Sequence, residues 1–258
     1  MSLATLSRSI KGSVVLITGA ASGMGRATAH VFADAGAQLA LIDINAEPLG
    51  AVVDEVIAAG GVAHGWTLDL SDRKAIAPVV DMVQAHFGRL DILVNNAGIS
   101  IPAPIDHENY DAVWDKSFAV LLTAQVAMIR AALPYLRQAE HPRIINVAST
   151  EALGATKFGS PYTAAKSGVV GLTRSMAVEL GGEGITVNCV CPGPINTGMT
   201  AAIPDEQKVI FAKRRTALRR YAEPEEVAHA TLSFALPASQ YITGATLPVD
   251  GGLTIRNA

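Results

Sequence analysis

The sequence predicts one doubly wound α/β domain, in which a parallel sheet of about seven strands carries helices on both faces. Short runs rich in β-branched residues alternate with longer helical patterns along the chain. The strand runs are continuously apolar, which is typical of parallel strands buried on both faces. The 258 residues, half of them hydrophobic, suffice for one large core, and the composition shows no linker or repeat. Residues 1–258 are therefore predicted to be a single domain.

The elements follow one another in a regular order. The first strand, SVVLITG, ends at a glycine, and the helix after it stops at Gly36. The expected strands cover 13–19, 37–44, 62–70, 90–98, 143–149, 184–193 and 245–252. The expected helices cover 24–36, 46–61, 72–87, 107–138, 160–181 and 224–236. The most apolar of these, FAVLLTAQVAMIRAALPYL, is interrupted by Thr123, Gln125 and Arg130, so we expect a buried or interface helix and no membrane span.

Composition narrows the class of protein. A formal net charge of -3 gives no reason to expect nucleic acid or an anionic membrane as a partner. The start of the chain, MSLATLSRSIKG, has no apolar run of the kind found in signal peptides, so a cytoplasmic protein is expected. Cys189 and Cys191 would point the same way on a strand, as reduced, buried thiols. Because the histidines are scattered, no metal site is expected.

The stretch TGAASGMG, residues 18–25, joins the first strand to the first helix. A glycine permits the tight turn, and two further glycines let the backbone approach a pyrophosphate and the neighbouring strand. The helix that begins there points free N–H groups and its positive dipole end at the phosphates. This context predicts a Rossmann-type dinucleotide site. Its members would be Gly19, Ser22, Gly23, Met24 and Gly25.

Asp43 ends the second strand, 18 residues after Gly25. A carboxylate there can accept hydrogen bonds from both ribose hydroxyls of the adenosine half and would repel a 2′-phosphate. Ser22 and Ile44 stand where a basic residue could welcome that phosphate. NAD is therefore expected as the cofactor. A helix cap is the other explanation for an acid here, but Asn45 suits the cap better.

Tyr162 and Lys166 lie four residues apart in SPYTAAKSG, so one helical turn brings them side by side. A free tyrosine, with a pKa of about 10, is a poor base at neutral pH. A cation within about 4–6 Å favours the phenolate and lowers that pKa. Lys166 would thus tune Tyr162 as a general acid/base. An exposed pair without function is the alternative.

Taken together, the motifs resemble the short-chain dehydrogenase/reductase family, in its shorter branch of about 250 residues. They are TGAASGMG, LDL at 68–70, NNAG at 95–98, Ser149, YTAAK and PGPINT at 192–197, within a resemblance that runs from Ser13 to about Gly252. The resemblance implies an NAD(H)-dependent oxidoreductase that interconverts a secondary alcohol and a ketone by hydride transfer. Ser149, thirteen residues before Tyr162, would hydrogen-bond the substrate oxygen from the carboxyl end of its strand. Thr150 should point away.

The same resemblance implies how the cofactor lies. Asp69 and Leu70 would lie against the adenine. The adenine-ribose region would be lined by Asn96, Ala97 and Gly98. The nicotinamide half would meet Pro192, Gly193, Ile195 and Thr197, and Tyr162 and Lys166 would also contact the cofactor.

One position departs from the family pattern. The family carries an asparagine seven residues after a tryptophan-like anchor, and here Trp114 is followed at that spacing by Leu121. That asparagine helps to hold a water that links the lysine to solvent, and leucine cannot form a hydrogen bond. The proton relay is then organised differently, with Ser117 one turn away as a candidate substitute. A cofactor-binding regulatory protein with weak or no catalysis is the alternative.

Residues 194–220 are expected to form a lid over the substrate. Its apolar members suggest a partly hydrophobic pocket, and its basic members could attract an acidic thioester substrate. A solvated helix face is the other reading of those charges. A 3-oxoacyl-thioester (acyl-carrier-protein) reductase is therefore an alternative function, although the NAD-type Asp43 weakens it. The apolar residues are Ile195, Met199, Ile203, Ile210 and Phe211, and the basic ones are Lys213, Arg214, Arg215, Arg219 and Arg220.

Two expectations concern the substrate's surroundings and the assembly. Glu151, Leu153 and Tyr162 would face a small-molecule alcohol or ketone. Family members are commonly tetramers, and the helices at 107–138 and 160–181 are apolar on more than one face. A homotetramer is expected, with a dimer as the alternative.

Overall fold

A computed structural model of the chain describes residues 5–257, and a seven-stranded sheet forms its centre. Every neighbouring pair of strands is parallel, in the order β3-β2-β1-β4-β5-β6-β7. The predicted parallel sheet of about seven strands is confirmed. The strands are β1 (Val14–Thr18), β2 (Gln38–Asp43), β3 (Val62–Thr67), β4 (Ile92–Asn95), β5 (Arg143–Val147), β6 (Thr186–Pro192) and β7 (Thr246–Val249).

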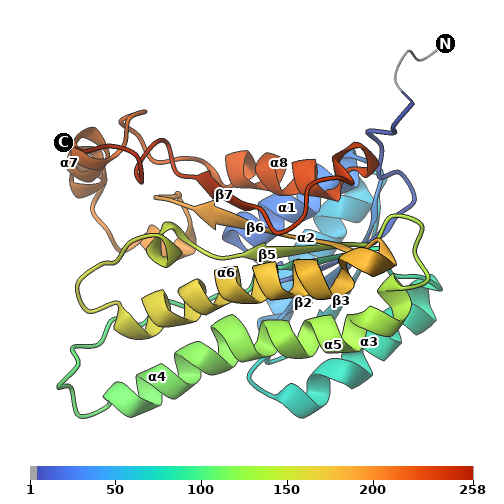
Figure 1. The fold of residues 1–258 in the computed structure, drawn as a ribbon, viewed down its shortest axis with the longest axis horizontal. Coiled ribbons are helices and arrows are strands. Elements are labelled where there is room, and N and C mark those ends of the chain that lie inside the picture. The colour runs from blue at the N-terminus through green and yellow to red at the C-terminus, as the bar shows by residue number, and fades with distance from the viewer. Residues whose placement is uncertain (1–4, 258) are drawn as a thin grey trace.

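Helices cover both faces of this sheet, as Figure 1 shows. One layer consists of α1 (Gly23–Asp34), α2 (Ala46–Ala58) and α8 (Pro224–Ala235). The other consists of α3 (Arg73–Phe87), α4 (Tyr110–Phe118), α5 (Ala124–Leu136) and α6 (Ser160–Leu180). The strand order reverses between β1 and β4, which is where doubly wound sheets bind their ligands.

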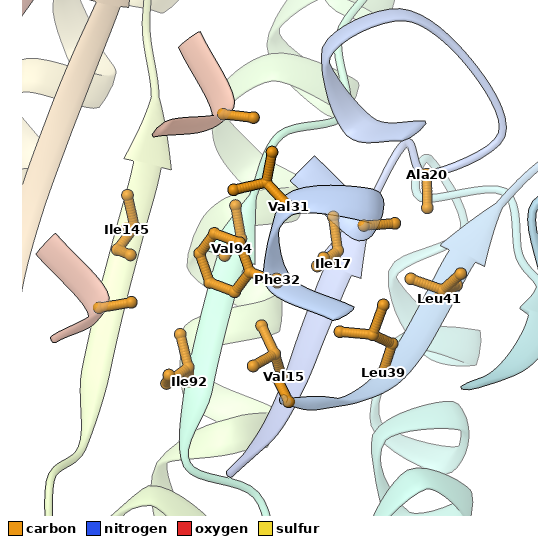
Figure 2. Close-up of a cluster of buried hydrophobic side chains, with 14 of the residues drawn as sticks. Val15, Ile17, Ala20, Val31, Phe32, Leu39, Leu41, Ile92, Val94 and Ile145 are labelled. Atoms are coloured by element: carbon orange, nitrogen blue, oxygen red, sulfur yellow. The ribbon is translucent and has the colours of Figure 1, made fainter. Parts of the chain in front are cut away.

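The core between the sheet and α1 explains why the strands are so apolar. Phe32 of α1 is fully buried and lies over Val15, Ile17, Ile92 and Val94, as Figure 2 shows. Burying one such side chain contributes about 1.5–3 kcal/mol. A second cluster of buried apolar side chains lies between the sheet and the α3, α5 and α6 layer. Strands covered on both faces cannot alternate with polar residues, and that accounts for the pattern in the sequence.

The long helix expected at 107–138 is not regular. A π-helical turn at Ala119–Thr123 separates α4 from α5 and places Leu121 at its centre. The whole stretch Tyr110–Leu136 has 27 residues, and its most apolar window of 18 residues has a mean hydropathy of 1.5, so by length and composition it could cross a membrane. In the fold, however, α5 packs on α3, and α4 packs on α6. These contacts make it a helix of the layer that covers the sheet.

All seven predicted strands end earlier in the structure, and three of them end three residues earlier. The strand expected at 62–70 ends at Thr67, the one expected at 90–98 ends at Asn95, and the one expected at 245–252 ends at Val249. The residues beyond leave the sheet as loops at its carboxyl edge. The side chains of Cys189 and Cys191 lie in one buried cluster on β6, pointing the same way as expected.

The segment 194–220, expected as a lid, contains a short 3₁₀ turn at Gly198–Thr200 and the helix α7 (Asp205–Arg215). In Figure 1, α7 stands apart from the two helix layers, at the end of the molecule where α6 begins. The segment is closed at its base. Ile195 and Ala222 form a parallel bridge, and the N–H of Asn196 donates to the Ala222 carbonyl oxygen over 2.9 Å.

Candidate active site

The glycine turn between β1 and α1 is packed so closely that side chains would not fit. A Cβ placed on Gly25 would lie 1.9 Å from the carbonyl oxygen of Gly19. Gly19 and Gly23 have positive φ angles, of 67° and 53°, which residues with a side chain adopt only at a cost. The sequence therefore folds here into a cradle lined by backbone, in front of the first turn of α1. This arrangement fits the pyrophosphate of a dinucleotide.

The cradle is tied to the end of β4. The hydroxyl of Thr18 accepts hydrogen bonds from the N–H groups of Asn96 and Ala97, over 3.0 and 3.1 Å. The side-chain amide of Asn96 donates to the carbonyl oxygens of Thr18 and Gly19, over 2.9 and 3.2 Å. The side chain of Asn96 thus braces the glycine turn, and its expected place beside the ribose stays a prediction. Thr18 was missed, although a threonine directly before the glycine turn was a visible signal.

Asp43 stands at the carboxyl end of β2 and is only 9% exposed. One carboxylate oxygen accepts from the N–H of Ala21 in the glycine turn, over 3.0 Å. The other accepts from the backbone and side-chain nitrogens of Asn45, over 3.0 and 3.2 Å. Asn45 is the N-cap residue of α2, as expected, but its side chain makes no cap hydrogen bond. Asp43 is therefore fixed beside the cradle, and Ile44 next to it is exposed.

Asp69 and Leu70 follow β3 at the same edge of the sheet. Leu70 is buried, and Asp69 accepts hydrogen bonds from the N–H and the hydroxyl of Ser71, over 2.8 and 2.7 Å. These bonds lower the pKa of Asp69, with a smaller contribution from Lys116 at 4.0 Å. The carboxylate is thus charged and oriented at the position where the adenine was expected.

Ser149 directly follows the apolar part of β5 and caps a 3₁₀ turn at Thr150–Ala152. Its hydroxyl accepts the N–H of Glu151 over 3.1 Å, and the residue is 8% exposed. The strand thus ends by presenting a hydroxyl at the carboxyl edge of the sheet. This agrees with the placement that the sequence predicted.

Tyr162 and Lys166 occupy the first two turns of α6, beside the end of β5. The Lys166 Nζ lies 5.7 Å from the centre of the Tyr162 ring. Lys166 is 3% exposed, and its ammonium group donates to the carbonyl oxygen of Val147 over 2.7 Å. The two side chains are neighbours, as the spacing predicted, and both approach the residues that end β5.

The pKa of Tyr162 differs in direction from our expectation. Burial raises the pKa of Tyr162, a hydrogen-bonding contact with Ser149 lowers it, and the charges of Glu151 and Cys191 raise it further. We expected Lys166 to lower it, but in this structure burial outweighs any such effect, and Lys166 is directed to Val147. Burial also lowers the pKa of Lys166, to about 8, so the lysine loses its proton at a lower pH than an exposed lysine does.

Leu121 faces this group of residues. It is fully buried in the π-helical turn, and a Cβ placed on Gly98 would lie 3.5 Å from Leu121 Cδ2 and 3.8 Å from Lys166 Nζ. Leu121 and Lys166 therefore both approach the backbone of Gly98. Ser117, the candidate substitute for a hydrogen-bonding residue, lies buried one turn earlier in α4.

The start of the segment 194–220 closes the site from the other side. A Cβ placed on Gly23 would lie 3.3 Å from the side chain of Thr197, so Thr197 rests against the glycine turn. Ile195 is buried, and Pro192 and Gly193 lead from β6 to it. The expected nicotinamide-side residues thus lie at one edge of the sheet with the cradle.

Comparison with known proteins gives the family. A family model described as enoyl-(acyl carrier protein) reductase matches residues 19–254. The meso-2,3-butanediol dehydrogenase of Serratia marcescens is 39% identical over 93% of this chain and 94% of its own length. The chain belongs to the short-chain dehydrogenase/reductase family.

Other members of the short-chain dehydrogenase/reductase family differ in their printed activities. The 3-oxoacyl-(acyl-carrier-protein) reductase of Thermotoga maritima is 38% identical over 95% of this chain and 99% of its own. A solved structure of carveol dehydrogenase from Mycobacterium avium, in complex with NAD, has a TM-score of 0.91 and 30% identity. It covers 97% of this chain and 100% of its own. The family is therefore fixed, while alcohols and thioesters both occur among the relatives' substrates.

This short-chain dehydrogenase/reductase also contains a buried polar chain that the sequence analysis missed. Asn95 of β4 donates to the Asn146 side-chain oxygen over 2.9 Å, and Asn146 of β5 donates to the Thr173 hydroxyl of α6 over 3.0 Å. These bonds fasten the helix that carries Tyr162 and Lys166 to the sheet. Asparagines inside the apolar runs ILVNN and RIINV were the available signal.

Proposed function

We propose that the protein is an NAD(H)-dependent oxidoreductase that interconverts a secondary alcohol and a ketone. The observation that carries the proposal is the grouping of Ser149, Tyr162 and Lys166 at the carboxyl edge of the sheet. The backbone cradle of the glycine turn lies at the same edge. Family membership supports it, since relatives are named as dehydrogenases of meso-2,3-butanediol and of carveol.

Each residue has a distinct part in the proposed reaction. When bound, the nicotinamide supplies or accepts the hydride. In the oxidising direction the Tyr162 phenolate takes the proton from the substrate hydroxyl, and the Ser149 hydroxyl holds the substrate oxygen by a hydrogen bond. Lys166 places a positive charge near the phenolate and stabilises it. In the reducing direction Tyr162 returns a proton to the carbonyl oxygen.

The residues present fit NAD. The cradle leaves room for a pyrophosphate only because its glycines lack side chains, and Asp43 is held at the edge of the cradle as a hydrogen-bond acceptor. A buried carboxylate disfavours a 2′-phosphate, so we propose NAD as the preferred cofactor over NADP. Ser22, Met24, Asp69, Gly98 and Thr197 remain proposed contacts of the same cofactor.

A 3-oxoacyl-thioester reductase is a second candidate. It is favoured by exposed basic residues at the end of α7 and just after it, which could attract an acidic carrier protein. The Thermotoga maritima relative is named as such an enzyme. The buried Asp43 weighs against it, because biosynthetic reductases more often use NADPH. The basic residues are Lys213, Arg214, Arg215 and Arg219.

We also propose a homotetramer in the cytoplasm. The helices α4, α5 and α6 form one layer on the sheet, and Val178 of α6 is an apolar residue that is 85% exposed on this layer. A layer of this kind suits pairing with the same layer of a second copy. Light scattering on the purified protein tests the mass, and a dimer is the alternative outcome.

Two measurements test the proposed activity. Calorimetric titration with NAD and with NADP measures cofactor affinity, and absorbance of reduced nicotinamide follows turnover on secondary alcohols and on an acetoacetyl thioester. We expect tighter binding of NAD, turnover of alcohols, and a loss of about 10²–10⁴ in kcat for Tyr162→Phe with the NAD affinity kept. Tight NAD binding without turnover of any substrate would instead indicate a cofactor-binding regulatory protein. That alternative is supported by Leu121, which stands where the family has an asparagine.

A further inference from the structure

We propose that Glu151 is a specificity-determining residue whose carboxylate binds a second hydroxyl group of the substrate, next to the reacting carbinol. The substrate would then be a diol or polyol. This inference rests on the proposed function and extends it from secondary alcohols in general to those with a neighbouring hydroxyl.

The backbone places Glu151 between the two residues that would hold the reacting oxygen. Its N–H donates to the Ser149 hydroxyl over 3.1 Å, so the two residues share one turn after β5. One of its carboxylate oxygens, Oε2, accepts from the hydroxyl of Thr163 over 3.2 Å, and Thr163 is the residue directly after Tyr162. The carboxylate is thus linked to the turn that carries Ser149 and to the helix that carries Tyr162, and we place the second hydroxyl of the substrate against it.

The Glu151 carboxylate is held in place by two hydrogen bonds but can accept further ones. Its Oε1 accepts from the hydroxyl of Thr156 over 2.6 Å. An ionised carboxylate has about four acceptor sites, and the two threonines occupy two of them. Glu151 is half-buried, so the remaining sites face a partly screened space. A hydroxyl donor is the neutral group that satisfies them.

The charge of Glu151 is not neutralised by a neighbouring cation among the described residues. Within residues 5–257, the ion pairs closer than 4.0 Å do not involve Glu151. The basic residue closest in sequence, Lys157, places its Nζ 4.7 Å from the ring centre of Phe158. The field of Glu151 reaches the phenol, because it raises the pKa of Tyr162. The same field would repel a substrate carboxylate at this place.

The test compares three four-carbon secondary alcohols that differ in one group: 2,3-butanediol, 2-butanol and 3-hydroxybutanoate. We expect the diol to have a kcat/KM at least about tenfold above that of 2-butanol, as a charge-assisted hydrogen bond provides. In Glu151→Gln this ratio should fall by about tenfold, while 3-hydroxybutanoate gains relative to 2-butanol. Glu140→Gln is the matched control, because that exposed acid lies at the opposite edge of the sheet, before β5.

A second variant keeps the proposal testable if Glu151→Gln does not fold. Thr156→Val removes one donor that orients the carboxylate, on an exposed residue, and should lower the diol preference by about threefold. Equal diol preferences in the wild type and in both variants would overturn the role of Glu151, although the dehydrogenase would stand. An absence of turnover with all three alcohols, despite NAD binding, would remove the proposed function itself.

Discussion

The Lys166 ammonium group is hydrogen-bonded to the Val147 carbonyl oxygen, 2.7 Å away at the end of β5. Its neighbour Tyr162 is close to it, with the ring centre 5.7 Å from Nζ, but receives no hydrogen bond from it in this structure. Burial lowers the pKa of the lysine to about 8 and raises the pKa of the tyrosine, so each charged form is less favourable than in water, although the lysine is still mostly charged at neutral pH. The proposed acid/base chemistry therefore depends on the pKa values of Tyr162 and Lys166.

The pH dependence of the proposed reaction should follow Tyr162. Because its pKa is raised, the phenol is protonated at neutral pH, and kcat/KM for alcohol oxidation should rise with pH up to alkaline values. Ketone reduction, which uses the protonated form, should not need alkaline pH. Ser149→Ala removes the contact that lowers this pKa, so its oxidation profile should move to higher pH. A profile that is flat from about pH 7 to about pH 10 would contradict this role.

The charge of Glu151 should be visible in the same profile. Tyr162 is faced by Ser149 and Glu151 from the turn after β5, by Cys191 from β6, and by Lys166 one turn along α6. Since Glu151 raises the pKa of Tyr162, Glu151→Gln should move the rise of the oxidation profile to lower pH. The profile of Glu140→Gln should coincide with that of the wild type. A shift to higher pH in Glu151→Gln would be inconsistent with the structure.

Lys166 should make stability depend on pH. Its folded pKa, about 8, lies below the ordinary value of 10.5, so between these values the unfolded chain binds more protons and the free energy of unfolding rises with pH. The thiols Cys189 and Cys191 oppose the burial effect but do not cancel it. A Lys166→Met variant lacks this increase in the free energy of unfolding with pH. The wild-type advantage over the variant should grow by roughly 3 kcal/mol between about pH 7 and about pH 10.5, measured by urea unfolding.

Leu121 should limit proton transfer if the lysine exchanges its proton through this side of the site. Leu121→Asn places a hydrogen-bonding group beside Lys166 Nζ, and kcat for alcohol oxidation should rise. Leu121→Ala opens space there without adding a polar group and should not raise it. Both variants should be less stable, by about 2–5 kcal/mol for the alanine, because Leu121 is fully buried. An unchanged or lower rate in Leu121→Asn would show a separate proton route.

The parts that the sequence predicted well depend on local patterns. The glycine turn, the seven apolar strands and the Tyr162–Lys166 spacing are each set by residues close together in the chain, and the structure places them as expected. The position of Asp43 at the end of β2 could also be predicted, because the end of an apolar run marks the edge of a parallel sheet.

The parts that were missed depend on tertiary contacts. The pKa of Tyr162 is set mainly by burial, which the spacing of two residues does not reveal. The π-helical turn around Leu121 breaks a periodicity that looked continuous. The hydrogen bonds from the Asn96 amide to Thr18 and Gly19, at the end of the neighbouring strand, were also not predicted. The burial of Tyr162 and the bonds of Asn96 involve residues far apart in sequence, and the π-helical turn is a local departure that the apolar periodicity did not reveal.

The base of the segment 194–220 is pinned by more than the Ile195–Ala222 bridge. The Ala222 N–H donates to the Pro194 carbonyl oxygen over 3.0 Å, and the Asn196 amide donates to the Glu223 carboxylate over 2.7 Å. Because the two ends of the segment are hydrogen-bonded to each other, the chain between them can change in length at little entropic cost. We therefore expect variants with an exchanged segment between these two ends to keep the seven-stranded sheet folded.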